Sequence, residues 1–295
     1  MFVHCPVLVR EIIGHLSLKP GDVIMDATLG GGGHSQEILK HVLPGGKIIA
    51  VDRDPDAIER SKVKFKEVSG SMIFVNEDFR NIGSIIEKSG IKKVNGAVFD
   101  LGMSSFQVDE EERGFSFSKD GPLDMRYDRH KGISASDVVN RFSRDEIADI
   151  IRSYGEERHA RHLANIICSE RQKKRIRTTK ELSDLVTRAI GRRYTRQMMH
   201  PACRTFQALR IFVNDELDSE REALTEIFDH TEKQGRICVI SFHSLEDRIA
   251  KHLFRDMERT GKVRIVTKRP IVPSEEEKRQ NPRSRSAKLR IAERV

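Results

Sequence analysis

The residues best suited to chemistry lie in the segment Asp26-Ala-Thr-Leu-Gly-Gly-Gly-Gly-His-Ser35, directly after the apolar run Val23-Ile24-Met25. A short β-type run that ends in an acid, four glycines and an amphipathic stretch predict a strand, a turn and a helix. Glycines at such a turn let a ligand approach the backbone closely, and they permit positive φ. The free N–H groups at the start of the helix face that ligand. We therefore expect a nucleotide-like cofactor at this turn.

The residues around the glycines indicate which cofactor binds. A dinucleotide fingerprint needs a third glycine at a position that falls on Ser35 or Gln36, so the pattern fails in both registers, and no P-loop lysine follows. This argues against a dehydrogenase, which is the first alternative function. A second acid, Asp52, ends the run Lys47-Ile-Ile-Ala-Val-Asp52, about 20 residues beyond the glycines, where a carboxylate binds ribose hydroxyls. An acid before the glycines followed by a ribose-binding acid resembles the S-adenosylmethionine methyltransferases. The alternatives are a flexible loop and, for Asp52, a helix cap.

The surrounding elements alternate between strands and helices and predict an α/β fold with a doubly wound, Rossmann-like parallel sheet. Ligands of such sheets bind at the carboxyl ends of the strands, and Asp26, Asp52, Asp78 and Asp100 each end or closely follow a strand. The expected strands are Val23–Met25, Lys47–Asp52, Ser71–Val75, Val94–Asp100, Arg236–Ile240, Val263–Thr267 and Leu289–Ile291, with early helices from Pro55 to about Val68 and from Ile82 to Glu87.

The middle of the chain has a different, helical pattern. Ser143-Arg-Asp-Glu146 and Thr178-Thr-Lys-Glu181 are capping boxes followed by helically spaced aliphatic residues, and a long helix is expected around Thr205 to His230. Strand signals return only afterwards. We therefore expect a discontinuous methyltransferase domain at 1–115 and 200–295, with an all-helical substrate-recognition domain inserted at 116–199.

Asp100 and the loop after it are candidates for activating an amine. The lone pair of an aryl amine is delocalised into its ring, so the amine attacks poorly until acceptors engage its N–H bonds. Acceptors also stabilise the positive charge that develops during methyl transfer. The Asp100 carboxylate and the Leu101 carbonyl are suited to this role, and the alternative is that Asp100 only binds the cofactor or caps a turn.

Longer motifs make the resemblance specific, and they cover essentially the whole chain. The chain resembles the bacterial 16S rRNA cytosine-N4 methyltransferase family. That resemblance implies S-adenosylmethionine as the methyl donor, a cytosine of the ribosomal decoding region as the acceptor, and a helical insertion. The motifs are the glycine segment, Val51-Asp-Arg-Asp-Pro55, Asp100-Leu-Gly-Met-Ser-Ser105, Glu112-Arg-Gly-Phe-Ser-Phe117, Gly121-Pro-Leu-Asp-Met-Arg126, Tyr154-Gly-Glu-Glu-Arg158, His200-Pro-Ala-Cys-Arg-Thr-Phe-Gln-Ala-Leu-Arg210, Ile240-Ser-Phe-His-Ser-Leu-Glu-Asp-Arg248 and the tail from Asn281.

The resemblance also implies which residues contact the cofactor. Asp52 would hold the ribose and Phe79 would lie beside the adenine. The full set that the family implies is Gly32, Gly33, His34, Asp52, Phe79, Asp100 and Gln107.

One departure concerns the target base. Amino methyltransferases of DNA commonly carry Asp/Asn-Pro-Pro-Tyr after the fourth strand, whereas this chain has Asp100-Leu-Gly-Met. The stacking aromatic is therefore elsewhere, with Phe106, Phe115 and Phe117 as candidates. A second catalytic candidate is His243, because the segment Ser241-Phe-His-Ser-Leu-Glu-Asp follows a strand. The alternative is a cap, either by His243 or by Ser244 with Asp247.

Charge and composition favour a polyanionic partner. The 295 residues carry a formal net charge of +8 and the pI is near 9.3. Basic runs at Arg171–Arg177 and Arg188–Arg196, with a basic tail at Arg283–Arg294, suggest contacts with RNA phosphates, the alternative being solvated faces. The partner implied is 16S rRNA within a small-subunit particle, and the remaining alternative function is a non-enzymatic RNA-binding or assembly factor.

Other features predict a cytoplasmic protein without metal. The four cysteines are scattered with no Cys-x-x-Cys pair, and His159 and His162 lack a third ligand, so no metal site is indicated. The N-terminus does not have the pattern of a signal peptide, and no apolar run approaches the ~20 residues that span a bilayer.

Overall fold

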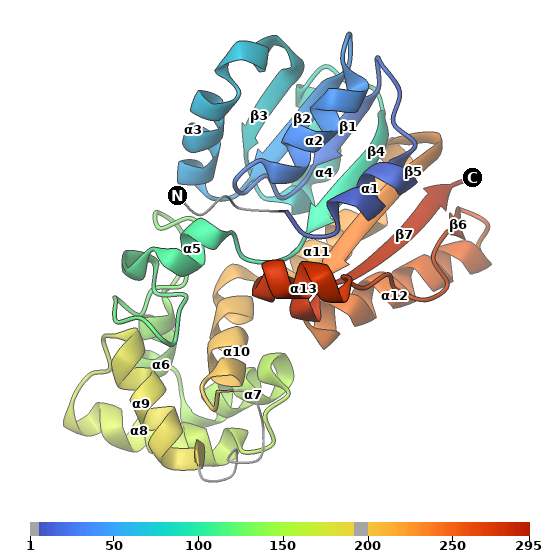
Figure 1. Ribbon diagram of the computed structural model, residues 1–295. Helices are drawn as coiled ribbons and strands as arrows, with labels where there is room; N and C mark the ends of the chain where they lie inside the picture. The colour runs from blue at the N-terminus through green and yellow to red at the C-terminus, as the bar shows by residue number, and fades with distance from the viewer. Residues whose placement is uncertain (1–5, 192–199) are drawn as a thin grey trace. The chain divides into compact units, whose positions relative to one another are not determined.

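The computed structural model of this chain describes residues 6–191 and 200–295. It contains two compact units, of which the first joins Met1–Met103 to Leu217–Val295 and the second is Ser104–Glu216 (Figure 1). The second unit is longer at both ends than the insertion predicted at 116–199. Packing explains the difference at its C-terminal side, because Phe206 packs edge-on against Phe117 and Asn214 donates to the Met125 carbonyl.

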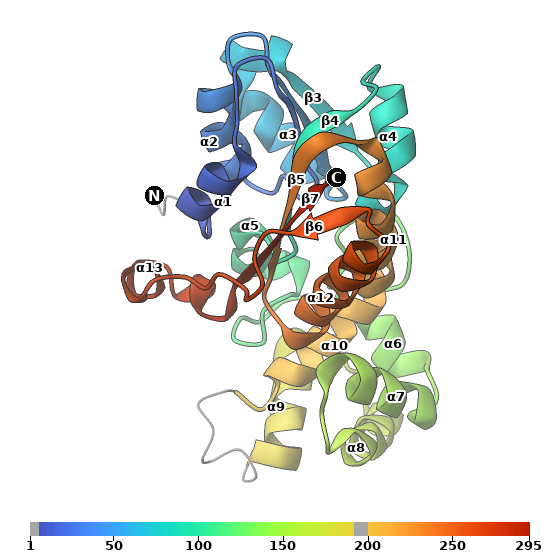
Figure 2. The same cartoon turned by 90° about the vertical axis from the view of Figure 1, so that its right-hand side faces the viewer.

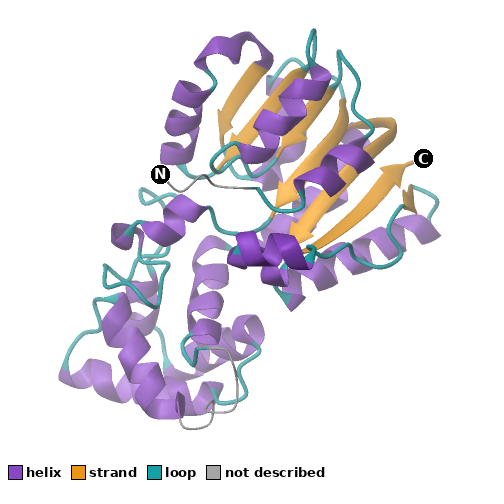
Figure 3. Ribbon diagram, viewed as in Figure 1, coloured by secondary structure: helices purple, strands orange, loops and turns teal. Residues whose placement is uncertain are grey.

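The first unit is built on a seven-stranded sheet with the order β3-β2-β1-β4-β5-β7-β6 (Figure 3). The α/β, Rossmann-like fold class predicted from the sequence is confirmed. The sheet is not parallel throughout, however, because β7 runs antiparallel to both of its neighbours. The segment between β6 and β7 holds only short helices and no long crossover helix of the kind that joins parallel strands. The strands are β1 (Val23–Asp26), β2 (Lys47–Asp52), β3 (Met72–Asn76), β4 (Val94–Asp100), β5 (Thr231–Ser241), β6 (Val263–Ile265) and β7 (Lys288–Arg294).

Helices cover both faces of this sheet, as Figure 2 shows. The buried runs of the parallel strands supply apolar side chains to two cores, one on each face. One core contains residues of α1 (Val9–Leu16), α2 (Gly33–Val42) and α3 (Pro55–Lys64), and the other contains residues of α4 (Ile82–Lys88), α11 (Glu216–Glu226) and α12 (Ser244–Arg259).

Strand register brings the acids to one edge. Asp26, Asp52 and Asp100 are the last residues of β1, β2 and β4, which are neighbouring parallel strands. Across the sheet, Asp100 pairs with Ile240 of β5, and Ile240 pairs with Leu289 of β7. The carboxyl edge of the sheet therefore presents three carboxylates from three adjacent strands.

Two helix predictions need correction. The helix expected from Pro55 to about Val68 ends at Lys64, and a 3₁₀ segment, Lys66–Ser71, follows it. The long helix expected around Thr205 to His230 is two α-helices and a 3₁₀ turn, because Asp215 adopts left-handed φ of 51° and breaks the helix after Asn214. The amphipathic pattern continues through the break, which is why periodicity alone misses it.

The described residues of the second unit form helices, together with a long irregular segment at 114–134 that makes one isolated β-bridge, from Pro122 to Thr178. Both predicted capping boxes, at Ser143 with Glu146 and at Thr178 with Glu181, are present at helix starts. Its helices are α5 (Ser105–Asp109), α6 (Ala135–Arg141), α7 (Arg144–Gly155), α8 (Ala160–Lys173), α9 (Thr179–Ile190) and α10 (Cys203–Asn214), and α13 (Glu275–Gln280) completes the set in the first unit. Across residues 6–191 and 200–295, no helix is long and apolar enough to cross a membrane.

Candidate functional site

The glycine turn between β1 and α2 has the backbone geometry that its sequence predicts. Gly30 and Gly32 have positive φ, at 49° and 67°. Gly32 also lacks space for a side chain, because a Cβ there would lie 2.5 Å from Cε2 of Phe65. No side chain caps the start of α2 at Gly32. The first N–H groups of α2 are thus left for a ligand with acceptor atoms.

Buried polar contacts of Asp26 and Thr28 hold the glycine turn in place. Asp26 is buried, and its carboxylate accepts hydrogen bonds from Ser35 Oγ at 2.6 Å and from Thr28 N at 3.2 Å. Burial raises the pKa of Asp26, although the Ser35 hydrogen bond opposes that shift. Thr28 Oγ1 in turn accepts from Asp100 N at 2.7 Å, which ties the turn to the end of β4.

Lys64 fixes the other side of the turn, and the sequence analysis did not identify it. Its Nζ donates to the carbonyl of Gly31 at 2.8 Å and to that of Gly32 at 3.3 Å. The ammonium lies 5.2 Å from the centroid of the Phe65 ring, the same ring that excludes a side chain at Gly32. A lysine at the end of α3 carries no sequence signal that points to a turn more than thirty residues earlier.

Asp52, the predicted ribose ligand, is held in place by backbone N–H groups. Its Oδ2 accepts from Gly30 N at 2.7 Å and its Oδ1 accepts from Asp54 N at 2.9 Å. Burial raises the pKa of Asp52 to about 6, against the two backbone hydrogen bonds, which lower it. Each oxygen retains a second lone pair, so the ionised carboxylate can still accept from two hydroxyl groups.

Asp100 and His34 meet at the carboxyl edge of β4. His34 Nε2 lies 3.3 Å from Asp100 Oδ2. Burial alone lowers the pKa of His34, but the Asp100 carboxylate outweighs it and the pKa is raised. Asp100 Oδ1 is buried and has no hydrogen-bond partner among the residues that the structure describes. A carboxylate oxygen without a hydrogen-bond partner, beside a glycine turn, is suited to accept a hydrogen bond from an N–H group of a ligand.

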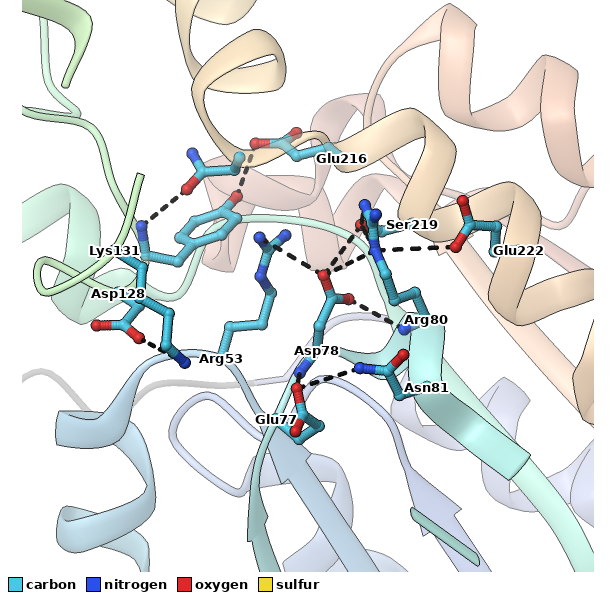
Figure 4. A network of polar contacts seen from close by, with 12 residues as sticks. Arg53, Glu77, Asp78, Arg80, Asn81, Asp128, Lys131, Glu216, Ser219 and Glu222 are labelled. Atoms are coloured by element: carbon cyan, nitrogen blue, oxygen red, sulfur yellow. Dashed lines mark hydrogen bonds and ion pairs between the residues drawn. The ribbon is translucent and has the colours of Figure 1, made fainter. Parts of the chain in front are cut away.

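Asp78, the remaining strand-end acid, has a structural environment (Figure 4). Its Oδ2 lies 3.0 Å from Arg80 Nε and 3.6 Å from Arg53 Nη2, and its Oδ1 accepts from Arg80 N. Ser219 Oγ also donates to it at 3.3 Å. With two guanidinium groups around it, Asp78 is neutralised by the protein itself.

Phe79 follows Asp78 and is half-buried. Its ring packs edge-on against Phe99 with centroids 5.9 Å apart, at the border of one of the two cores. That packing fixes the ring and is compatible with a second face turned to a ligand. The role of Phe79 beside the adenine stays a prediction.

Gln107, the last predicted cofactor residue, lies in the second unit. It forms a capping box at the start of α5, where its Oε1 accepts from Ser104 N at 3.1 Å and its N–H donates to Ser104 Oγ. Among the three aromatic candidates for stacking on the base, Phe115 is buried against Tyr127 and Phe117 stacks on His200. Phe106, by contrast, is 42% exposed.

A second polar network, which includes Glu216 (Figure 4), lies within the second unit. The Tyr127 hydroxyl donates to Glu216 Oε1 at 3.0 Å, and the Tyr127 N–H donates to Asn214 Oδ1 at 2.8 Å. Arg210 pairs with the same Glu216 carboxylate. These contacts fix the end of α10, where the predicted long helix breaks.

His243 caps α12, as one of the sequence alternatives proposes. Its Nδ1 accepts from Glu246 N at 3.3 Å, the Glu246 carboxylate accepts from His243 N, and Nε2 lies 3.0 Å from Glu246 Oε1. The cap is therefore His243 and not Ser244. A catalytic role for the imidazole stays a prediction.

Several side chains of the predicted RNA-binding basic runs form hydrogen bonds or ion pairs within the protein. Arg171 donates to the Val139 and Phe142 carbonyls, while Lys173, Lys174 and Arg175 pair with acids of the second unit. Part of the run Arg188–Arg196 lies outside the described residues. The basic tail is also partly structural, because Lys288–Arg294 is β7.

Known proteins are similar to this chain over its whole length. The model of the MraW methylase family matches residues 1–295. The chain is 46% identical over 310 residues to the ribosomal RNA small subunit methyltransferase H of Halothermothrix orenii, covering 100% of this chain and 99% of that protein. It is 47% identical over 295 residues to the protein of the same name from Persephonella marina, covering both completely.

A solved structure has the same general fold. It is described as an rRNA-methylase from Clostridium thermocellum, and it matches with a TM-score of 0.50 at 10% sequence identity, covering 99% of this chain and 100% of that one. At this identity the match supports the fold alone.

Proposed function

We propose, because this chain belongs to the MraW methylase family, that it transfers a methyl group from S-adenosylmethionine to the exocyclic N4 of a cytosine in 16S rRNA. The substrate is a cytosine of the decoding region, presented in a small-subunit ribosomal particle. We place the reaction in the cytoplasm, since its substrate is ribosomal RNA.

The glycine turn and the strand-end acids fit the cofactor. S-adenosylmethionine supplies an electrophilic methyl group on its sulfonium. Gly32, Gly33 and His34 would contact it at the start of α2, and Asp52 would accept hydrogen bonds from its ribose hydroxyls. Phe79 and Gln107 complete the proposed set.

The observation that carries the catalytic assignment is the buried, unsatisfied Oδ1 of Asp100. This oxygen would accept a hydrogen bond from an N–H group of the cytosine amine. That hydrogen bond localises the nitrogen lone pair for attack on the methyl carbon. S-adenosylmethionine would supply the methyl group and leave as S-adenosylhomocysteine. The Asp100 carboxylate would stabilise the positive charge that develops on the amine nitrogen. One amine proton then leaves toward Asp100, beside which His34 lies.

Single-turnover methyl transfer by Asp100→Asn tests this role. At saturating S-adenosylmethionine we expect the rate to fall by about 10²–10³, because asparagine keeps an acceptor oxygen but lacks the negative charge that stabilises the transition state and the basic oxygen that takes the proton. The cofactor dissociation constant should change much less. If the rate falls only in step with cofactor binding, Asp100 positions the cofactor and does not activate the amine.

A further inference from the structure

A pocket on the first unit lies between α12 and the outer strands β6 and β7, and its lining is strongly cationic. It encloses about 290 Å³. Since liquid water occupies about 30 Å³ per molecule, this volume accommodates a phosphate group with several waters. The polar side chains that line it are Lys251, Arg255, Glu258, Thr267, Lys268 and Arg290.

Three of these cations have no partner within residues 6–191 and 200–295. Lys251, Arg255 and Lys268 make no ion pair or side-chain hydrogen bond with any residue that the structure describes. Lys251 and Arg255 are four residues apart on α12, so they share one face of the helix, where like charges repel. Unpaired cations gathered around one hollow favour an anionic ligand.

The other polar groups of the pocket do not cancel this charge. Glu258 is the one acid in the lining, and its Oε1 accepts from Ile265 N at 2.8 Å. Arg290 pairs with Asp247 at 2.7 Å. Thr267 Oγ1 accepts from Ile291 N, which leaves its hydroxyl hydrogen for a ligand oxygen.

The pocket is close to the reacting edge of the sheet by register. Asp100 is opposite Ile240, and Ile240 is opposite Leu289, the residue before Arg290. Since strands are about 4.8 Å apart, the Cα of Arg290 lies roughly 10 Å across the sheet from that of Asp100. The two side chains point to opposite faces, because Arg290 pairs with Asp247 of α12 whereas Asp100 lies beside His34 of α2. A polynucleotide with one base at Asp100 would therefore reach this pocket by passing around the carboxyl edge of the sheet.

We infer that this pocket binds a backbone phosphate of the rRNA substrate, close to the target cytosine. The inference rests on the proposed function. It differs from the expectation that the run Arg171–Arg177 binds the RNA, because Lys173 and Lys174 are paired with acids. Of the four pocket cations, only Arg290 is paired with an acid among the described residues. The contact neutralises phosphates without reading sequence.

A charge-matched pair of triple variants tests the pocket. Lys251→Gln, Arg255→Gln and Lys268→Gln are combined in one protein, and Lys66→Gln, Lys92→Gln and Lys233→Gln in the control, whose three lysines are exposed on the same unit and outside the pocket. Binding of a 16S rRNA transcript is measured against salt. We expect the pocket variant to lose at least about tenfold in affinity at about 100 mM salt and to have a salt slope shallower by about 2–3. The control should behave like the parent.

The same experiment separates this inference from the proposed function. The cofactor dissociation constant of the pocket variant should equal that of the parent. If the parent methylates rRNA and the pocket variant keeps the parent affinity and salt slope, the pocket inference is overturned and the function stands. A parent that neither binds nor methylates 16S rRNA, as the transcript or within a small-subunit particle, overturns both.

Chemical protection tests the pocket without any substitution. A lysine-reactive reagent followed by mass spectrometry should show Lys251 and Lys268 shielded by the transcript, with Lys66 and Lys233 still reactive. Inorganic phosphate at matched ionic strength should not displace the RNA. Equal reactivity of all four lysines, or displacement by phosphate alone, would contradict an RNA-backbone site.

Discussion

At the scale of single residues, the same acid type serves different purposes at neighbouring strand ends. Asp78 is paired with Arg53 and Arg80, whereas Asp100 has a buried oxygen with no hydrogen-bond partner among residues 6–191 and 200–295. The sequence places both acids after strands and gives no means of distinguishing them. Their partners are brought together only by folding, which is why Asp78 could not be excluded from the predicted cluster of acids.

Asp52 should make cofactor binding dependent on pH. Its pKa is raised to about 6 by burial, so in the free protein the carboxyl group is protonated below that value. Ribose hydroxyls donate to the ionised form, so the Asp52-dependent part of the S-adenosylmethionine affinity should be constant above about pH 6 and fall toward tenfold per pH unit below it. Calorimetry from about pH 5 to about pH 7, roughly one unit either side of that pKa, measures this change in affinity.

Asp52→Asn is the control for that titration. It should bind more weakly at pH 7 and lose the Asp52-dependent part of the pH profile, whereas His34, whose pKa is also raised, still titrates in both proteins. The raised pKa of Asp52 has the opposite effect on the free energy of unfolding, which it makes larger at low pH. Because the folded pKa is above the unfolded one, the stability contributed by this group is full below pH 4 and is lost as the pH rises to about 6. Identical pH profiles for the two proteins would remove Asp52 from the binding site.

At the scale of elements, capping signals predicted helix starts well where the cap and its partner are close in sequence. The boxes at Ser143 and Thr178 are present as expected, but the α12 cap is His243 rather than Ser244. Histidine is a less frequent cap, so the serine beside it gives the stronger sequence signal. The break at Asp215 and the antiparallel direction of β7 depend on tertiary packing, and neither has a local signature.

Two substitutions at His243 separate its cap from its proposed catalytic role. His243→Asn keeps a good N-cap, so its free energy of unfolding should be within about 0.5 kcal/mol of that of the parent. The free energy of unfolding of His243→Ala should be lower by about 1 kcal/mol. If the imidazole acts in catalysis, His243→Asn should still lower the single-turnover rate at least tenfold. Denaturant unfolding and rapid-quench methyl transfer provide the two readings. A fully active His243→Asn variant would assign His243 to capping alone.

At the scale of the whole molecule, the sequence predicted the fold class and the presence of a helical insertion, and the family match covers all 295 residues. The extents of the two compact units were less predictable, because α10 and the segment after Met103 join the helical unit through packing partners that are distant in sequence. Lys64 illustrates the same limit within the site, since its contacts with Gly31 and Gly32 cross more than thirty residues.

The central claim is that the whole protein methylates the N4 of a cytosine in 16S rRNA. Small-subunit particles from cells that lack the gene are incubated with the purified protein and methyl-labelled S-adenosylmethionine, and the rRNA is then digested to nucleosides for mass spectrometry. We predict label in N4-methylcytidine with the parent protein and almost none with Asp100→Asn over the same time. Label in a different nucleoside, or no label from a protein that binds S-adenosylmethionine normally, would contradict the account.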